Sequence, residues 1–509
     1  MAAGGAPMRV NTVFLVSLAI CLPVGAWGVI APEQLTAAAL GFTGYVMTGA
    51  SWWWLLLCTG FVGLSAFLAL GPYGAVRLGA DDERPEFSTP SWLAMLFAGG
   101  MGAGLLFWGV AEPVSHFANP PGLAGGTPQA AREAMVITNL HWGLHAWSIY
   151  GVCALVIAYF AFRLKRGSMI STPLRALFDG PAAGRAATAA DVLGVLAVVF
   201  GLAGSVAMGV LQVRAGLVSA LGAPETDLVS VAILLALFLC YMLSASTGVE
   251  TGIRILSNVN MGLAIALLAF VLFAGPTAFI LESFVDTLGA YAARFVQLAF
   301  RLFPYEGLSD WSATWTLTYL IWWLAWGPFV GIFIARISRG RTIREFCLGV
   351  ILVPTVFSIF WFATFGGAGI YIQLYGPGGL SELIAEDVAV ALFAFFDFFP
   401  ASAAPMTVAL LLIFIFLVTS ADSATFVLSM MTTDGDLNPP TAHKMVWGVL
   451  IALITGATLL SGSVAVARAM AATGAIPFSA ILILQVAGFL RTLVAEEPRG
   501  RPAAAEAAE

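Results

Sequence analysis

Twelve long apolar runs are the feature that most constrains what this chain can fold into. Each is long enough for an α-helix to cross the hydrocarbon core of a bilayer, which takes about 20 residues. They cover approximately residues 10–30, 51–71, 92–112, 140–162, 191–213, 228–246, 259–283, 313–335, 346–370, 404–431, 444–463 and 471–490. Because 60% of the residues are hydrophobic and only 10% are charged, a water-soluble enzyme is excluded. The sequence predicts an all-α integral membrane protein with twelve transmembrane helices.

The basic residues predict the orientation of these helices. With the N-terminus in the cytoplasm, 17 of the 22 Lys and Arg residues fall in cytoplasmic segments and five fall outside. This asymmetry follows the positive-inside rule, so we expect both termini in the cytoplasm. A cleaved signal peptide is the alternative for the first run, which is however longer than the apolar part of such peptides. No basic face is present, so we expect no nucleic-acid partner.

Two of the predicted helices contain glycine-rich interruptions. The third run holds four glycines between Gly99 and Gly104, and the eighth holds Gly327-Pro328 followed by Gly331, five runs later. Unwound backbone at membrane depth survives only where protein or a water-filled cavity satisfies its polar groups. Paired breaks in corresponding halves of a chain are typical of a transporter binding site. The alternative is that these glycines only let helices pack closely.

The spacing of the two interruptions predicts two N-terminal helices followed by two inverted five-helix repeats. On this interpretation residues 1–90 hold the N-terminal tail and helices 1 and 2, and residues 91–283 form the first repeat, helices 3 to 7. Residues 284–312 are an external connector, and residues 313–490 form the second repeat, helices 8 to 12. Residues 491–509 are expected to be a short disordered cytoplasmic tail.

A polar cluster interrupts the otherwise apolar tenth run. It begins at Thr419 and Ser420 and includes Asp422. Hydroxyl oxygens and the carbonyls of an unwound helix are hard ligands of the kind that bind sodium. The alternative is that the hydroxyls bond only to the backbone of their own helix. An acidic residue at membrane depth is costly, so Asp422 is either part of an ion site or a structural hydrogen-bond anchor.

Aromatic residues gather in the fourth and eighth runs. They are Trp142, Trp147 and Tyr150 in the fourth run, and Trp322, Trp323 and Trp326 in the eighth. A trimethylated ammonium has no hydrogen to donate, but it binds well against the electron-rich faces of indole and phenol rings. The alternative is an aromatic belt at the membrane interface. The tryptophans of the eighth run lie in its middle, which favours cation recognition, whereas Trp142 lies nearer an end.

Two histidines flank this aromatic group. His141 and His145 are four residues apart and would lie on one face of a helix, where they could bind a metal or relay protons. No third ligand accompanies them in the sequence. We therefore expect them to serve in helix packing.

Four stretches resemble the betaine/carnitine/choline transporter family. They are MGAGLLFWGVAEP from Met101, HWGLHAWSIY from His141, WWLAWGPFVGIFIARISRGRTIREF from Trp322 and TSADSATFVLSMMTTDGDLNPP from Thr419. The resemblance implies a secondary transporter with the inverted-repeat architecture, usually a homotrimer, in the lipid of a bacterial inner membrane. It implies a quaternary ammonium or related zwitterion as substrate, with glycine betaine favoured, and no enzymatic activity.

The resemblance also implies which residues form the sites. The substrate-binding positions that it matches are Trp142, Trp147, Tyr150, Trp323, Trp326, Gly99 and Met101, with Phe329 along the cytoplasmic path. The two positions in the glycine stretch would offer backbone amides to the carboxylate of the substrate. The coupling ion would be Na⁺, held by carbonyls of Ala98 and Met101 and by hydroxyls of Thr419 and Ser420.

Members of this family differ in coupling, and two positions favour sodium here. Proton-coupled members carry an Asp where this chain has Gly104, and sodium-independent exchangers carry a basic residue in the fifth run, where residues 191–213 have none. We therefore expect sodium symport and no other cofactor. A sodium-independent substrate/product exchanger remains the alternative, as do choline, carnitine or dimethylsulfoniopropionate as substrates.

Overall fold

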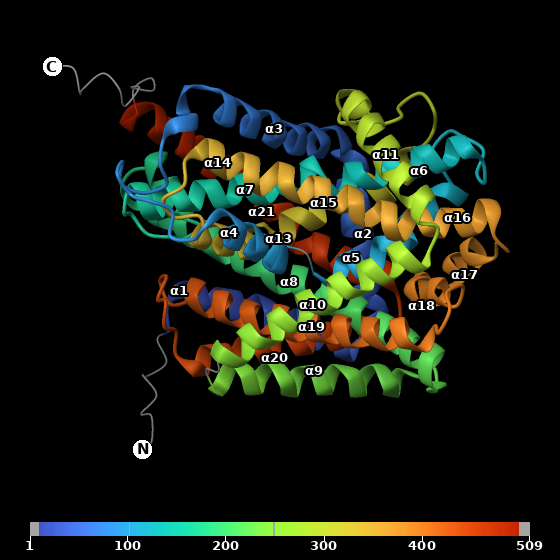
Figure 1. Cartoon of the computed structure of the whole chain (residues 1–509). Helices are drawn as coiled ribbons and strands as arrows, with labels where there is room; N and C mark the ends of the chain where they lie inside the picture. Colours follow the sequence, from blue (N-terminus) through green and yellow to red (C-terminus); the bar gives the residue numbers. More distant parts are fainter. Residues whose placement is uncertain (1–9, 101, 248–249, 498–509) are drawn as a thin grey trace.

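The computed structural model describes residues 10–100, 102–247 and 250–497. Within this part of the chain the regular structure is helical, and the only bridge between extended segments joins Arg77 to Thr342. Figure 1 shows the long helices running roughly parallel, with α8 (Gly180–Leu221) in the interior and α3 (Ser51–Leu70) and α9 (Asp227–Thr247) at opposite edges. The start of α1 (Thr12–Ile30) and the end of α21 (Val464–Glu496) lie at the same end of the bundle.

Eleven helical stretches of the described residues are long and apolar enough to cross a bilayer. Besides α1, α3, α8, α9 and α21 they comprise α6 with α7 (Pro128–Trp142, Leu144–Ala158), α10 (Glu250–Ala274), α13 (Thr318–Ile337), α14 to α16 (Ile343–Cys347, Val353–Phe362, Ala368–Tyr375), α19 (Ala403–Met431) and α20 (Thr441–Leu459). The remaining predicted helix, 92–112, is divided into α4 (Thr89–Gly100) and α5 (Ala103–Ala118). Neither half is long enough to count as a membrane span, which is why the described residues contain eleven candidate spans and not the twelve predicted.

Two further long helices lie wholly or mostly outside the predicted runs. α2 (Pro32–Gly49) follows α1 directly, and α11 (Thr277–Leu298) covers the start of the segment predicted as a connector. Both carry a mixture of apolar and polar residues, so neither forms an apolar run of the kind that reveals a membrane span.

The third run is interrupted as predicted, but the eighth is not. α13 continues through Gly327, Pro328 and Gly331 without a break, so the prediction of an interruption there is wrong. Pro328 costs only the one hydrogen bond that its missing N–H would give to the previous turn, and the helices around α13 hold that turn in place. Gly331 has the packing role instead, since a Cβ there would lie 2.8 Å from Cys153 Sγ.

A second break lies in the fourth run, at Gly143. α6 ends at Trp142 and α7 begins at Leu144, while Gly143 itself has φ −101° and ψ −127°. The Leu144 N–H, freed from the helix ladder, donates to the Tyr291 hydroxyl at 3.1 Å. A Cβ on Gly143 would lie 2.5 Å from the Asn139 carbonyl oxygen, so this conformation needs glycine. The break sets the direction of the neighbouring Trp142 side chain.

α8 is the central helix of the protein, buried between Ala190 and Gly216. It packs along α21, α19, α20 and α13. At Gly204 the backbones come so close that a Cβ would lie 2.2 Å from the Ala467 carbonyl oxygen in α21. Small residues at such crossings give helix packing in membranes its van der Waals contact.

Replacing Gly204 with valine is expected to destabilise the protein by about 1–3 kcal/mol, because the added atoms must push α8 and α21 apart. The melting temperature of the detergent-solubilised protein measures this effect. Gly184→Val in the same helix is the matched control, since nothing lies within 4 Å of a Cβ there. Equal melting temperatures for the two variants would contradict the close approach.

Candidate functional site

A cavity lies where α5, α6, α7, α8, α13 and α19 meet. Six aromatic side chains line it: Phe107, Trp142, Tyr150, Trp322, Trp323 and Trp326. The wall is completed by Gly102 to Gly104 at the break of the third run and by the polar side chains of Ser205, Gln212 and Ser420. None of the lining residues that the structure describes carries a formal charge. A cation in this cavity would therefore meet ring faces and neutral oxygen atoms.

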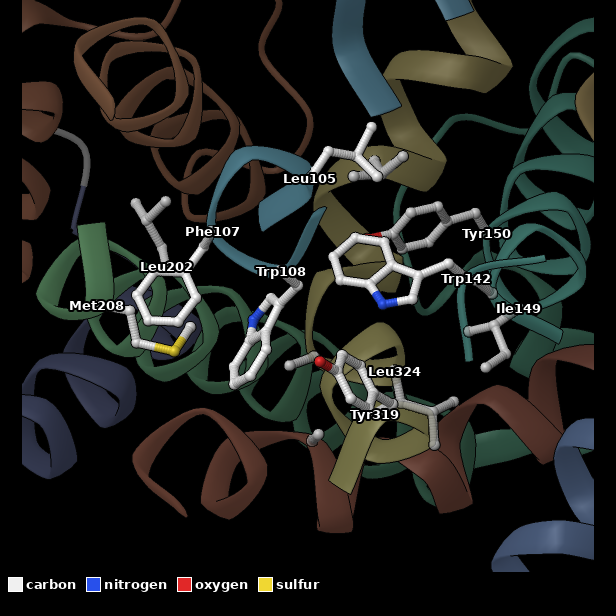
Figure 2. Packing of buried hydrophobic residues seen from close by; sticks show 14 of the residues in the cluster. Leu105, Phe107, Trp108, Trp142, Ile149, Tyr150, Leu202, Met208, Tyr319 and Leu324 are labelled. Atoms are coloured by element: carbon white, nitrogen blue, oxygen red, sulfur yellow. The ribbon is translucent and has the colours of Figure 1, made fainter. Parts of the chain in front are cut away.

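Three of the rings come from three different helices and fix one another edge to face. The Trp323 ring lies 5.0 Å from Trp142 at 84° and 5.4 Å from Tyr150 at 86°. The Trp323 indole N–H donates to the His141 carbonyl at 2.8 Å, next to the break at Gly143. Figure 2 shows Trp142 and Tyr150 with Tyr319, whose ring is 5.6 Å from Trp142. Edge-to-face pairs of this kind are favourable, so Trp142, Tyr150 and Trp323, which together form the aromatic box, stabilise one another in this arrangement.

Ser205 of α8 orients two further rings of the cavity. Its hydroxyl accepts the indole N–H of Trp322 at 3.1 Å and that of Trp326 at 3.0 Å. It donates in turn to the Gly201 carbonyl at 2.9 Å. A single hydroxyl thus satisfies two partly buried donors and orients both indoles on the wall of the cavity.

Replacing Ser205 with alanine is expected to weaken substrate binding about three- to tenfold, because two indole N–H groups lose their acceptor and each such loss costs about 1–3 kcal/mol, partly in stability. The KM for uptake reports the effect. Ser246→Ala in α9 is the control, since that exposed hydroxyl donates to the Leu243 carbonyl of its own helix. A wild-type KM in the Ser205 variant would exclude this orienting role.

A buried carboxylate stands next to the cavity, at Glu112 of α5. Its Oε2 accepts the Trp142 indole N–H at 2.6 Å, and its Oε1 lies 2.5 Å from His141 Nδ1 and 3.3 Å from His116 Nε2. The other His141 nitrogen lies 2.9 Å from the Thr316 hydroxyl. Glu112, His116 and His141, which form this cluster, are all buried. His141 therefore takes part in a polar network beyond the packing role expected for it.

The same three side chains have the composition of a metal site, with their ligand atoms within 4.8 Å of one another. The spacing indicates hydrogen bonds instead. Two ligands on one tetrahedral Zn²⁺, each about 2.0–2.1 Å from the ion, stand about 3.3 Å apart. Glu112 Oε1 and His141 Nδ1 are 2.5 Å apart, which is a short hydrogen bond.

Comparison with known proteins identifies the chain. The model of the betaine/carnitine/choline family transporters matches residues 12–498. The chain belongs to this transporter family. The glycine betaine transporter OpuD of Bacillus subtilis is 40% identical over 96% of this chain and 95% of its own length. The ectoine/hydroxyectoine transporter of Virgibacillus pantothenticus is 40% identical over 95% of this chain and 96% of its own length. A probable glycine betaine transporter of Desulfitobacterium hafniense is 35% identical over 97% and 99%. As a family member the chain is a membrane transporter and not an enzyme.

The substrate positions that the family resemblance implies divide into three groups in this transporter. Trp142, Tyr150, Trp323 and Trp326 line the cavity. Trp147 stands behind it, with its ring 6.0 Å from Tyr150 and at 84° to it. Phe329 lies beside the cavity, 5.6 Å from Trp326 along α13. Gly99 belongs to the last turn of α4, and Met101 lies outside the described residues.

The candidate sodium ligands are described only in part. Ser420 lines the cavity, and the neighbouring Thr419 hydroxyl donates within α19 to the carbonyls of Ile415 and Phe416 at 3.0 and 3.1 Å. Ala98 lies in the last turn of α4, next to Met101, which the structure does not describe. Asp422 is not among the lining residues and interacts with the Ser244 side chain of α9. This contact fits its alternative interpretation as a hydrogen-bond anchor.

Proposed function

We propose that this transporter takes up a quaternary ammonium zwitterion, with glycine betaine as the favoured substrate, in symport with sodium. The observation that carries the proposal is the uncharged cavity whose wall holds six aromatic side chains. A methylated onium group offers no hydrogen-bond donor, so it is recognised by ring faces, each contributing about 2 kcal/mol when desolvated. The similarity to transporters named for glycine betaine and for ectoine and hydroxyectoine supports this class of substrate.

Sodium coupling rests on the residues around the break in the third run. Ser420 reaches the cavity wall on which Gly102 to Gly104 lie, so a hydroxyl faces the region where α4 ends. Gly104 is not the Asp of proton-coupled members, and residues 191–213 of α8 hold no Lys or Arg. Each sodium ion carried inward gains about 2.3 kcal/mol per 100 mV of membrane potential, which drives accumulation.

The proposed cycle is alternating access. The outward-open protein binds sodium through Ala98, Met101, Thr419 and Ser420. The cation of the substrate then enters the aromatic box. Rocking of one helix bundle finally releases sodium and substrate past Trp326 and Phe329. The carboxylate of the zwitterion meets the backbone amides of the broken third helix, since the described lining residues include no Arg or Lys. We place the transporter in the bacterial inner membrane as a homotrimer with both termini cytoplasmic.

Uptake of labelled glycine betaine into proteoliposomes tests the proposal. Uptake with an inward sodium gradient, lost when potassium replaces sodium, is the expected result. Equal uptake in both salts, stimulated by internal betaine, would establish the exchanger instead. Unlabelled ectoine, choline, carnitine and dimethylsulfoniopropionate serve as competitors, and strong competition by one of them without betaine uptake would reassign the substrate.

A further inference from the structure

Glu112 bears a negative charge directly behind a wall of the cavity. The Trp142 indole lines the cavity, and its N–H points away from the aromatic box to Glu112 Oε2 at 2.6 Å. The carboxylate has no exposed surface. A buried carboxylate inside a membrane protein is expensive, and such residues are functional candidates by default.

The surroundings of Glu112 keep it ionised without giving it a strong cation as partner. The Trp142 N–H donates to its Oε2, and His141 Nδ1 and His116 Nε2 lie 2.5 and 3.3 Å from its Oε1, so three nitrogen atoms surround the carboxylate. Hydrogen bonds of this kind favour the charged form. Among the described residues no Lys or Arg forms an ion pair with it. Its ion-pair partners are His116 and His141, which compensate its charge only when they are protonated.

Arg468 of α21 interacts electrostatically with Glu112 but forms its direct contacts with other groups. Its guanidinium lies over the rings of Trp108, Trp315 and Tyr319, at 5.2, 5.4 and 5.5 Å from their centroids. It also donates to the Thr314 carbonyl at 2.5 Å. This cation lies against three aromatic rings and does not contact the Glu112 carboxylate.

An ionised acceptor on an indole N–H has two effects on a cation that lies against the face of the ring. It polarises the indole and makes its π face more negative, and it adds the attraction of a full charge across a region of low dielectric constant. A permanent cation in the box would experience both effects. An uncharged head group of the same shape would experience neither.

We propose that Glu112 is the buried counter-charge of the transported onium group, a positioning residue that acts through Trp142 and makes the cavity select cationic head groups over uncharged head groups of equal shape. This inference rests on the proposed function, because it takes the ligand to be a methylated onium. Glu112, His116 and His141 then form one functional unit behind the box.

Glu112→Gln tests the inference, because glutamine keeps the volume and an acceptor oxygen for the Trp142 N–H and removes the charge, while its NH2 group takes the place of the oxygen beside His116 and His141. Binding of labelled glycine betaine to the purified transporter is compared with competition by 3,3-dimethylbutanoate, in which a tert-butyl group replaces the trimethylammonium. The betaine affinity is expected to fall about tenfold or more, while the affinity for 3,3-dimethylbutanoate, an anion with an uncharged head group, should stay equal or rise, because Glu112 attracts only a cationic head group. Glu382→Gln, on the exposed surface of α17 (Leu380–Glu386), is the matched control.

The outcomes separate this inference from the proposed function. If the wild-type protein binds no betaine, the proposed substrate is wrong. If it binds betaine and Glu112→Gln weakens both ligands equally, or neither, Glu112 is only structural and the inference is overturned. Should Glu112→Gln fail to fold, Trp142→Phe replaces it, because phenylalanine keeps an aromatic face and lacks the N–H. It should then weaken betaine several-fold more than 3,3-dimethylbutanoate.

Discussion

Replacing Trp323 with leucine is expected to lower the affinity for glycine betaine about 30-fold, which corresponds to the roughly 2 kcal/mol of one desolvated cation–π contact. Trp323 is the ring on which the others depend. It packs edge to face on Trp142 and on Tyr150, and its N–H is fixed by the His141 carbonyl. Leucine fills part of the volume but offers the cation no π face.

Equilibrium binding of labelled betaine to the purified transporter measures this effect. Trp52→Leu in α3 is the control, because that ring is 56% exposed on the outside of the bundle and we expect it to contact lipid. An unchanged affinity after Trp323→Leu would remove the aromatic box from the mechanism. A folded protein is verified by its elution volume in detergent.

Replacing Thr419 and Ser420 together with alanine is expected to abolish the dependence of uptake on sodium. Two hydroxyl ligands would be lost, and the carbonyls left at the end of α4 do not complete the coordination of a hard cation. Ser420 lines the cavity, and Thr419 is its neighbour on α19.

The rate of betaine uptake as a function of sodium concentration checks this prediction. The wild-type rate should rise with sodium, and the double variant should show a low rate that no sodium concentration restores. Thr407→Ala is the control in the same helix, since its exposed hydroxyl donates only to the Ala403 carbonyl. A normal sodium response in the double variant would place the ion elsewhere.

The membrane fold is largely predictable from this sequence, because the length of an apolar run is set by the thickness of the bilayer. Every predicted run coincides with helix in the structure, and the interruption of the third run is confirmed. α2 was missed because its 18 residues mix Glu33, Gln34, threonines and alanines with the apolar ones. A hydropathy profile detects helices that are apolar along their whole length, and it detects a helix of mixed polarity less well.

The second break was predicted in the wrong helix. Gly327-Pro328 is the stronger signal by composition, yet α13 continues through it, whereas the lone Gly143 separates α6 from α7. A proline removes one donor whatever its surroundings are. Gly143 breaks its helix because Tyr291, distant in sequence, accepts the freed N–H of Leu144, and no local pattern reveals that partner.

The candidate site was predicted as a set of residue types and not as a network. The aromatic residues carry their chemistry in the sequence, and four of the five predicted ring positions line the cavity. Ser205 and Glu112 do not reveal the tryptophans that they bind, since these lie on other helices, whereas the i, i+4 spacing of Glu112 and His116 on α5 is a local signal for that contact. Glu112 stands beside Pro113 at the end of a predicted run, where an acidic residue usually marks the membrane boundary.

The length of α8 makes its N-terminal end a suitable place for a label that reports movement of the helix. Its 42 residues, at about 1.5 Å each, make a rod of about 63 Å, and even with a tilt of about 20° this exceeds the roughly 40–45 Å of a bilayer with its headgroups. The surplus lies at its N-terminal end, where Gly184 and its neighbours are exposed. If the rod pivots by about 10° around Gly204, Gly184 sweeps through about 5 Å, given about 30 Å between them. A spin label attached there would turn a small rotation inside the membrane into a displacement measurable in the aqueous phase.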